Sequence, residues 1–322
     1  MAIEGSIMKF DIIGMSDSYG AHRFSNNIIL QMLSDNSVAY DGLKFVWWIE
    51  KIFLDNKFEK DRDILEKNSW FGVAHVPLLT PKWAMYSQND LSRLMYSDSW
   101  FKAKSTCKGI ICLSEHLAGQ YSALLPEVPI YSLKHPMGQT GSMFSVNRFF
   151  KDRKIVMVGT WLRNFQSFLN ADIPYRKVVL HTKYGRSFIR DQYARYNPSI
   201  HRNLKNVENI DFLSDKAYDE LLSSSILFLG MHETSANNAV CESIMNSTPF
   251  ISLRHPAVEE YVGEEYPLFI DSYEELKNLD DEKVVAAHQY LRERDYLREA
   301  LSYKKFIDDF KKIYNRFGNV KK

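Results

Sequence analysis

Short apolar segments alternate with amphipathic stretches along the chain, and this alternation constrains the fold more strongly than any other feature. Near-continuous apolar strands that alternate with helices are typical of parallel sheets covered on both faces. We therefore predict an α/β fold with two Rossmann-like, doubly wound domains that face each other across a cleft. The strand candidates are residues 9–14, 70–74, 109–113 and 129–133 in a first series, and 154–159, 177–182, 208–213, 225–230, 249–253 and 267–270 in a second.

A segment without periodicity separates the two series, at residues 135–147, and contains Pro, Gly and Ser. We place an N-terminal domain at 1–140, a C-terminal domain at 141–300, and a C-terminal helix at 301–322, with packing on the N-terminal domain as one option for that helix. The apolar run at 43–54 does not distinguish strand from helix. Ligands of open parallel sheets bind beyond the carboxyl ends of the strands, so the residues that follow the strands are the informative ones.

Composition excludes several classes of protein. Lys and Arg total 41 against 40 for Asp and Glu, which argues against nucleic-acid binding through global charge. The three cysteines are an odd number and predict a reducing compartment, and no apolar run approaches the length of a membrane span. No signal peptide is read at the N-terminus, so we expect a cytoplasmic protein. Peripheral contact with the inner face of a membrane stays open, because the last helix carries several lysines: Lys304, Lys305, Lys311 and Lys312.

The strongest motif directly follows the fourth strand of the second series. An acid, small and amide residues and a second acid occur there in turn: Glu233, Ser235, Asn237, Asn238 and Glu242. The start of a helix offers free backbone N–H groups and the positive end of a dipole, which suit phosphate. Each glutamate could accept hydrogen bonds from sugar hydroxyls. The alternative is ordinary N-capping by Ser235 or Asn237, with Glu242 on a solvated face.

This stretch resembles the C-terminal signature of GT-B-fold glycosyltransferases of group 1, which use nucleotide sugars with retention. Their pattern is an acid, a small-residue loop, a second Glu on a helix and a Gly-Thr-Pro-like turn, and residues 242–249 match its second half. The resemblance implies that Glu233 touches the donor sugar as a catalytic residue and that Glu242 binds the ribose. The spacing departs from the pattern, because eight residues instead of seven separate the two acids.

A second motif follows the first strand of the same series and contains Gly159, Thr160 and Arg163. Glycine permits close approach of the backbone, and arginine can bind phosphate oxygens in a bidentate manner. In the resembled family the matching loop holds the donor diphosphate, and Arg163 is our candidate for this role. Lys183, in the loop after the next strand, is a candidate helper. The alternatives are a surface salt bridge for Arg163 and a solvated loop for Lys183.

The loop that contains Phe212 and Leu213 follows the third strand of the second series. The resemblance implies that this loop contacts the nucleotide base through backbone groups. A plain helix cap by Ser214 or Asp215 is the alternative reading, and both readings can hold together.

The N-terminal half carries weaker signals. His75 follows a strand and is a candidate catalytic residue that could hydrogen-bond the donor sugar or the acceptor hydroxyl, with a structural histidine as the alternative. Gly20 and His22 follow the first strand and are candidates on the acceptor side, and Gly20 resembles the glycine loop of the family. An Asp-x-Asp at Asp61 and Asp63 lies in a charged helical run, so no metal and no cofactor are expected.

These observations predict a metal-independent glycosyltransferase of glycoconjugate or polysaccharide biosynthesis. The donor would be a nucleotide sugar, with a UDP- or GDP-sugar expected, and the acceptor a hydroxyl group of a glycan, a lipid-linked glycan or another molecule. Retention is implied by the resemblance alone. Two alternatives stay open: a nucleotide-sugar 2-epimerase of the same fold, and a degenerate transferase that binds a nucleotide or sugar without catalysis. The balanced charge disfavours a nucleic-acid acceptor.

Overall fold

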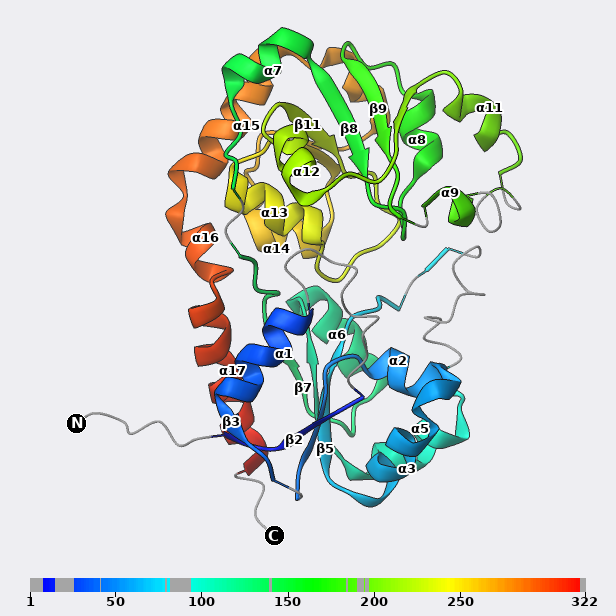
Figure 1. Ribbon diagram of the computed structural model, residues 1–322, viewed down its shortest axis with the longest axis vertical. Helices are drawn as coiled ribbons and strands as arrows, with labels where there is room; N and C mark the ends of the chain where they lie inside the picture. Colours follow the sequence, from blue (N-terminus) through cyan, green and yellow to red (C-terminus); the bar gives the residue numbers. More distant parts are fainter. Residues whose placement is uncertain are drawn as a thin grey trace, which may run out of the picture. The chain divides into compact units, whose positions relative to one another are not determined.

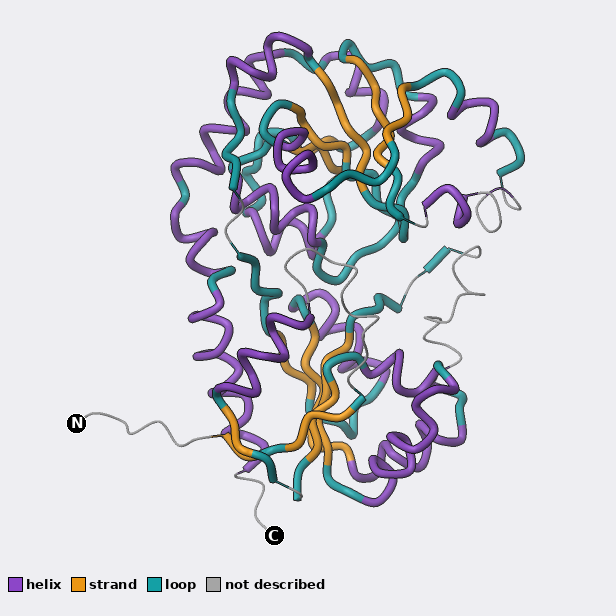
Figure 2. Tube along the Cα trace, viewed as in Figure 1, coloured by secondary structure: helices purple, strands orange, loops and turns teal. Residues whose placement is uncertain are grey.

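The computed structural model describes residues 8–14, 26–40, 42–78, 80–81, 94–138, 141–183, 185–189, 194 and 197–318. Gly20 and His22 lie outside these residues. The chain divides into two compact units (Figures 1 and 2). Unit 1 comprises Met1–Leu79, Met85–Pro136 and Ala300–Lys322, and unit 2 comprises Thr80–Ala84 and Met137–Glu299.

Unit 2 contains a six-stranded parallel sheet. Its strands lie in the order β10 (Glu208–Ile210), β9 (Arg176–Leu180), β8 (Lys154–Val158), β11 (Ser225–Phe228), β12 (Phe250–Leu253) and β13 (Phe269–Ile270). Numbered within the unit, this order is 3-2-1-4-5-6, which is the doubly wound order of dinucleotide-binding folds. The order reverses between β8 and β11, so the topological switch point lies beyond the carboxyl ends of these two strands.

Helices connect successive strands of this sheet as the sequence pattern predicts, and further helices precede the first strand and follow the last. They are α7 (Val146–Asp152), α8 (Phe165–Asn170), α9 (Gly185–Phe188), α11 (Ile200–Leu204), α12 (Asp215–Leu222), α13 (Asn238–Asn246), α14 (Pro256–Val262), η5 (Tyr273–Asn278), α15 (Asp281–Glu293) and α16 (Asp295–Ala300). The two central strands are almost completely buried, which explains why they read as continuous apolar runs.

Several strands end earlier than their apolar runs predict. β10 ends at Ile210 instead of residue 213, because β9, its neighbour in the described sheet, ends at Leu180 and the last ladder bond runs from His181 N to Ile210 O. Residues 211–214 therefore form a loop at the carboxyl edge of the sheet.

Unit 1 contains a five-stranded parallel sheet and a short parallel pair. The sheet has the order β2 (Asp11–Ile13), β4 (Lys44–Val46), β5 (Trp70–Ala74), β6 (Cys107–Cys112) and β7 (Ile130–Ser132), and β1 (Met8–Lys9) pairs with β3 (Ser37–Val38). Its helices are α1 (Asn26–Asp35), α2 (Ile49–Leu54), η2 (Asn56–Phe58), α3 (Glu59–Lys67), α5 (Asp98–Ala103), η3 (Lys104–Thr106), α6 (Glu115–Leu124) and α17 (Tyr303–Gly318).

The last helix, α17, belongs to the core of unit 1, although it is the element farthest from the first strands in the sequence (Figure 1). The ring of Phe310 lies 5.4 Å from that of Phe45 and 6.0 Å from that of Phe71, and Phe317 lies 4.7 Å from Phe71. Tyr314 Oη accepts a hydrogen bond from Lys9 N at 2.9 Å. Among the described helices, α17 included, none is long and apolar enough to cross a bilayer.

Candidate functional site

The loops that follow β8 and β11 are joined to each other at the switch point of unit 2. The two strands pair in register, so both loops begin at the same edge of the sheet. Asn164 N donates to Gly230 O at 2.9 Å, and His232 N donates to Leu162 O at 3.0 Å. The two loops that contain the sequence motifs therefore form one hydrogen-bonded framework, which positions the side chains of both motifs.

A tight turn directs Arg163 back toward the end of β8. Gly159 has φ +80°, and Leu162 has φ +57°, a left-handed conformation that costs a non-glycine residue about 1–2 kcal/mol. A Cβ atom on Gly159 would lie 3.2 Å from Arg163 Nη2. Glycine is thus needed both for the backbone angle and for the space that the guanidinium occupies.

The Arg163 side chain is buried and hydrogen-bonded to neutral groups. Nε donates to Val158 O at 3.0 Å, and Nη2 donates to Asn237 Oδ1 at 3.3 Å. In the part of the chain that the structure describes, the guanidinium forms no ion pair with a carboxylate. Burial lowers the pKa of Arg163 to about 10, so the group keeps its charge at neutral pH. The surface salt bridge considered as the alternative for Arg163 is therefore wrong.

Asn237 joins this arginine to the start of α13. It is the N-cap of the helix, and its Oδ1 accepts from Ala239 N at 2.9 Å as well as from Arg163. Ser235 is buried in the preceding loop, and Asn238 is the first residue of the helix. The N-cap by Asn237, which the sequence offered as an alternative, is therefore present. It places the positive end of the helix dipole beside the buried positive charge of Arg163. Both features attract an anion to the same point.

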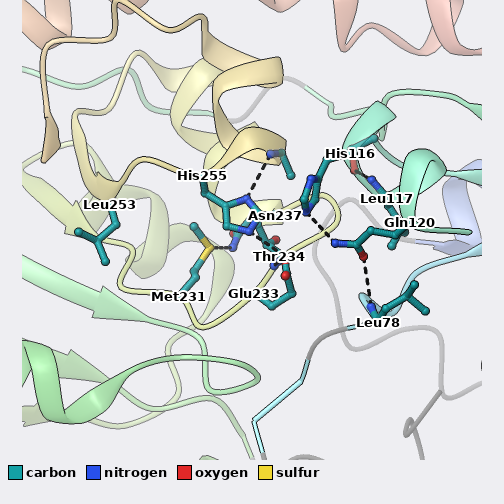
Figure 3. Close-up of polar contacts among 12 residues, drawn as sticks. Leu78, His116, Leu117, Gln120, Met231, Glu233, Thr234, Asn237, Leu253 and His255 are labelled. Atoms are coloured by element: carbon teal, nitrogen blue, oxygen red, sulfur yellow. Dashed lines mark hydrogen bonds and ion pairs between the residues drawn. The ribbon is translucent and has the colours of Figure 1, made fainter. Parts of the chain in front are cut away.

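The two glutamates of the motif are both buried, and each has different hydrogen-bond partners. Glu242 lies inside α13, and its Oε2 accepts from Tyr218 Oη of α12 at 3.0 Å, so the solvated face considered as its alternative is wrong. Glu233 Oε1 accepts from Thr234 N at 2.9 Å and contacts His255 Nε2 at 2.7 Å (Figure 3). Neither Tyr218 nor His255 was identified in the sequence. The signal for His255 was its place just after an apolar strand and before Pro256.

No protein-family model matches this chain, and no curated protein sequence matches it either. Solved structures do match. Sucrose-phosphate synthase from Thermosynechococcus elongatus aligns with a TM-score of 0.63 at 11% identity, over 87% of this chain and 74% of that one. Anabaena Alr3699/HepE, in complex with UDP and glucose, aligns with a TM-score of 0.60 at 10% identity, over 96% and 99% of the two chains.

A third match is a trehalose 6-phosphate synthase from Burkholderia multivorans, with a TM-score of 0.57 at 8% identity, over 97% of this chain and 98% of that one. These enzymes are GT-B glycosyltransferases. The chain has the GT-B fold. The expectation of two Rossmann-like domains is thereby confirmed, and the loops beyond β8 and β11 lie where a doubly wound sheet binds its ligand.

Other predicted donor residues of this GT-B chain lie beyond the neighbouring strands. Thr160 Oγ1 lies 3.1 Å from Thr182 Oγ1, which links the loops after β8 and β9, and Lys183 is exposed in the second of these loops. Phe212 is 65% exposed in the loop after β10, and Leu213 is half-buried beside it. The cap reading of this loop also holds, because Ser214 Oγ accepts from Ala217 N.

In unit 1 the structure places His75 among aromatic rings. The centroid of its imidazole lies 5.1 Å from the centroids of both Trp47 and Trp48, and both ring nitrogens are buried. These surroundings are typical of a structural histidine, and the catalytic role of His75 stays a prediction. The backbone N–H of His75 donates to Glu50 Oε1 at 2.8 Å, an acid that the sequence analysis did not single out.

Proposed function

We propose that this chain is a glycosyltransferase that transfers a sugar from a nucleotide-sugar donor to a hydroxyl acceptor. The observation that carries the proposal is Arg163, a buried guanidinium that forms no ion pair in the described part of the chain and lies beside the N-cap of α13. A buried charge is costly unless it is paired, and a diphosphate at the switch point would pair it. The Anabaena protein of the same fold was solved with UDP and glucose, which favours a UDP-sugar here over a GDP-sugar.

Each residue of the site has a distinct task in this proposal. The bond between the sugar C1 and the diphosphate oxygen breaks, a bond from C1 to the acceptor oxygen forms, and the acceptor proton passes to the departing diphosphate or to solvent. Arg163 and the start of α13 stabilise the negative charge that develops on the nucleoside diphosphate. Glu242 binds the ribose, and Glu233 binds the hydroxyls of the transferred sugar. The proposal also includes retention, a reaction without a metal or cofactor, and a cytoplasmic location at or near a membrane surface. These parts of the proposal rest on the resemblance and on the sequence.

Binding of nucleotides tests the donor site directly. We would titrate the wild type with UDP, GDP, ADP and CMP by calorimetry in the presence of a chelator, and repeat the titration with Arg163→Met. Hydrogen bonds to a charged group contribute about 1.5–3 kcal/mol, so we expect Arg163→Met to weaken binding about 10- to 100-fold. Arg176→Met is the matched control, because Arg176 is exposed at the opposite end of β9. Absence of binding by every nucleotide, or equal binding by Arg163→Met, would overturn the proposal.

Product analysis separates transfer from its two alternatives. The wild type is incubated with the sugar nucleotide of the class that binds, with a panel of sugar acceptors and without any acceptor, and the products are followed by NMR. Transfer or slow hydrolysis with release of nucleoside diphosphate supports a transferase, and the anomeric configuration of the first product reports retention or inversion. An epimerised sugar nucleotide would identify a 2-epimerase, and tight binding without any product a non-catalytic binding protein.

A further inference from the structure

His255 brings a third loop to the candidate site. It follows β12 and is the N-cap of α14, directly before Pro256, and its side chain is 17% exposed. Both nitrogens of its ring have partners in unit 2. Nε2 lies 2.7 Å from Glu233 Oε1 (Figure 3). Nδ1 lies 3.2 Å from Ala257 N. The imidazole therefore bridges the end of one helix and the carboxylate of the first motif acid.

The two contacts determine which nitrogen carries the hydrogen. The backbone N–H of Ala257 is only a donor, so Nδ1 of His255 must accept from it. The hydrogen of a neutral ring is then on Nε2, and it is donated to the carboxylate of Glu233. Protonation of Nδ1 would remove the cap of α14. The two contacts thus favour the Nε2–H tautomer, in which the ring caps α14 and donates to Glu233 at the same time.

The position of Glu233 in the chain makes a contact from another element important for its orientation. It lies between β11 and α13, in a segment without regular secondary structure. Its Oε1 accepts from the N–H of the next residue, Thr234, and from His255, and the second bond comes from a separate element of the sheet. The extended backbone of His255, with φ −147° and ψ 127°, is the conformation favoured before a proline, so the local sequence also holds the imidazole.

We propose that His255 is the positioning residue of Glu233, which it orients toward the transferred sugar as a neutral donor. This inference rests on the proposed function, because it assigns Glu233 to the donor sugar. A carboxylate with a fixed orientation loses less conformational freedom when it binds sugar hydroxyls in the transition state. His255 itself touches no reacting atom in this arrangement. Its effect should therefore be seen in kcat and should depend on the presence of Glu233.

Two substitutions separate the cap from the contact to Glu233. Asparagine is a preferred N-cap residue and is too short to reach Glu233, so His255→Asn keeps the first role and removes the second. We expect an unchanged Tm, a Kd for the nucleoside diphosphate within about threefold of the wild type, and a kcat about 10- to 100-fold lower. His255→Ala removes both roles and should in addition lower Tm by about 2–4 °C.

A double-mutant cycle with Glu233→Gln tests whether His255 acts through Glu233. We expect His255→Asn to change kcat less than about threefold in the Glu233→Gln background, because the group to be oriented is already altered. An equal loss of kcat in both backgrounds would overturn the positioning role, since His255 would then act independently. NMR of ¹⁵N-labelled histidine gives a readout besides activity: the wild type should show the Nε2–H tautomer at neutral pH, and a protonated ring or the Nδ1–H tautomer would also overturn it.

The same measurements distinguish a failure of this inference from a failure of the proposed function. A wild type that binds no nucleoside diphosphate overturns the donor site, and the role of His255 with it. A wild type that binds nucleotide and turns over, together with a His255→Asn variant of unchanged kcat, overturns the role of His255 alone. Nucleotide binding with a kcat loss that disappears in the Glu233→Gln background supports both.

Discussion

Arg163 depends on neighbours that carry no charge. Val158 O and Asn237 Oδ1 accept its hydrogen bonds, and Gly159 leaves the space in which the guanidinium lies. None of these groups neutralises the arginine, and all of them restrict its position. An arginine that is held in place by neutral partners keeps its charge for a ligand, whereas one that is paired with a carboxylate would have to break that pair first.

We expect Gly159→Ala to disturb this arrangement without touching the charge. The new Cβ would lie 3.2 Å from Arg163 Nη2, and φ +80° is strained for alanine. The variant should lose about 1–3 kcal/mol of unfolding free energy and bind the nucleoside diphosphate about tenfold more weakly. Urea denaturation and calorimetry measure the two effects. The matched control is Gly119→Ala in α6, where a Cβ would meet no atom within 4 Å; equal affinity in Gly159→Ala and the wild type would refute the expectation.

The sequence singled out polar residues of the candidate site but did not indicate their surroundings. Arg163, Glu233 and Glu242 were found because each follows a recognisable apolar strand or helix start. Their burial was not predictable, because it depends on which elements meet at the switch point. His255 was missed for the same reason: its partner, Glu233, lies 22 residues away on a different loop, and no local pattern connects the two.

Among the elements of unit 1, the short helix α2 carries an acid into the core. Glu50 is completely buried, and its Oε1 accepts from His75 N and Val76 N at 2.8 Å and from Tyr121 Oη at 3.3 Å. In the described part of the chain, Oε2 has no hydrogen-bond partner. Burial raises the pKa of Glu50 from 4.5 to about 7. The Glu50 carboxyl group therefore accepts hydrogen bonds from the backbone after β5, and its burial makes it harder to ionise.

This pKa predicts the direction in which pH changes stability. Between pH 4.5 and about 7 the folded chain keeps the Glu50 proton that the unfolded chain has released, so stability falls as pH rises. We expect the unfolding free energy to fall by about 2.5 kcal/mol between pH 5 and pH 8 because of this group, and we expect no such fall in Glu50→Gln. Urea denaturation of both proteins at these two pH values provides the test. An identical pH dependence in the two proteins would show that Glu50 does not titrate in this way.

The order of the elements could be predicted from the sequence more reliably than their ends. The apolar run at 43–54 was ambiguous because it contains one element of each kind, the strand Lys44–Val46 and the helix Ile49–Leu54. Both are buried, so neither shows the alternation of exposed and buried residues that would identify it. The early end of β10 was also hidden, since a strand ends where its neighbour ends.

For the molecule as a whole, α17 shows that unit 1 is not continuous in the sequence. Its apolar stripe packs on the five-stranded sheet of unit 1. The hydrogen bond between Lys9 and Tyr314 joins residues that are 305 positions apart in the sequence. The sequence of the helix does not specify which sheet it packs on, because an amphipathic stripe fits any complementary apolar surface. The partner of α17 is set by the three-dimensional packing.

We expect the removal of one ring from this helix to destabilise unit 1 strongly. Phe310 is completely buried among Phe10, Phe45 and Phe71, so Phe310→Ala should cost about 3–5 kcal/mol of unfolding free energy. Phe101→Ala is the control, because this ring is 72% exposed. Urea denaturation followed by circular dichroism compares the two variants, and equal stabilities would show that α17 contributes little to the core of unit 1.

The position of α17 in the chain also sets an order of events during synthesis. The strands of unit 1 precede the strands of unit 2 in the chain, yet the helix α17 that packs on their phenylalanine rings is translated after unit 2. All strands and helices of unit 2 are synthesised before α17 emerges. Unit 2 can therefore complete its core while unit 1 still lacks its last helix. We therefore expect unit 1 to complete its core after unit 2, with the phenylalanine rings that α17 contacts accessible until that helix emerges.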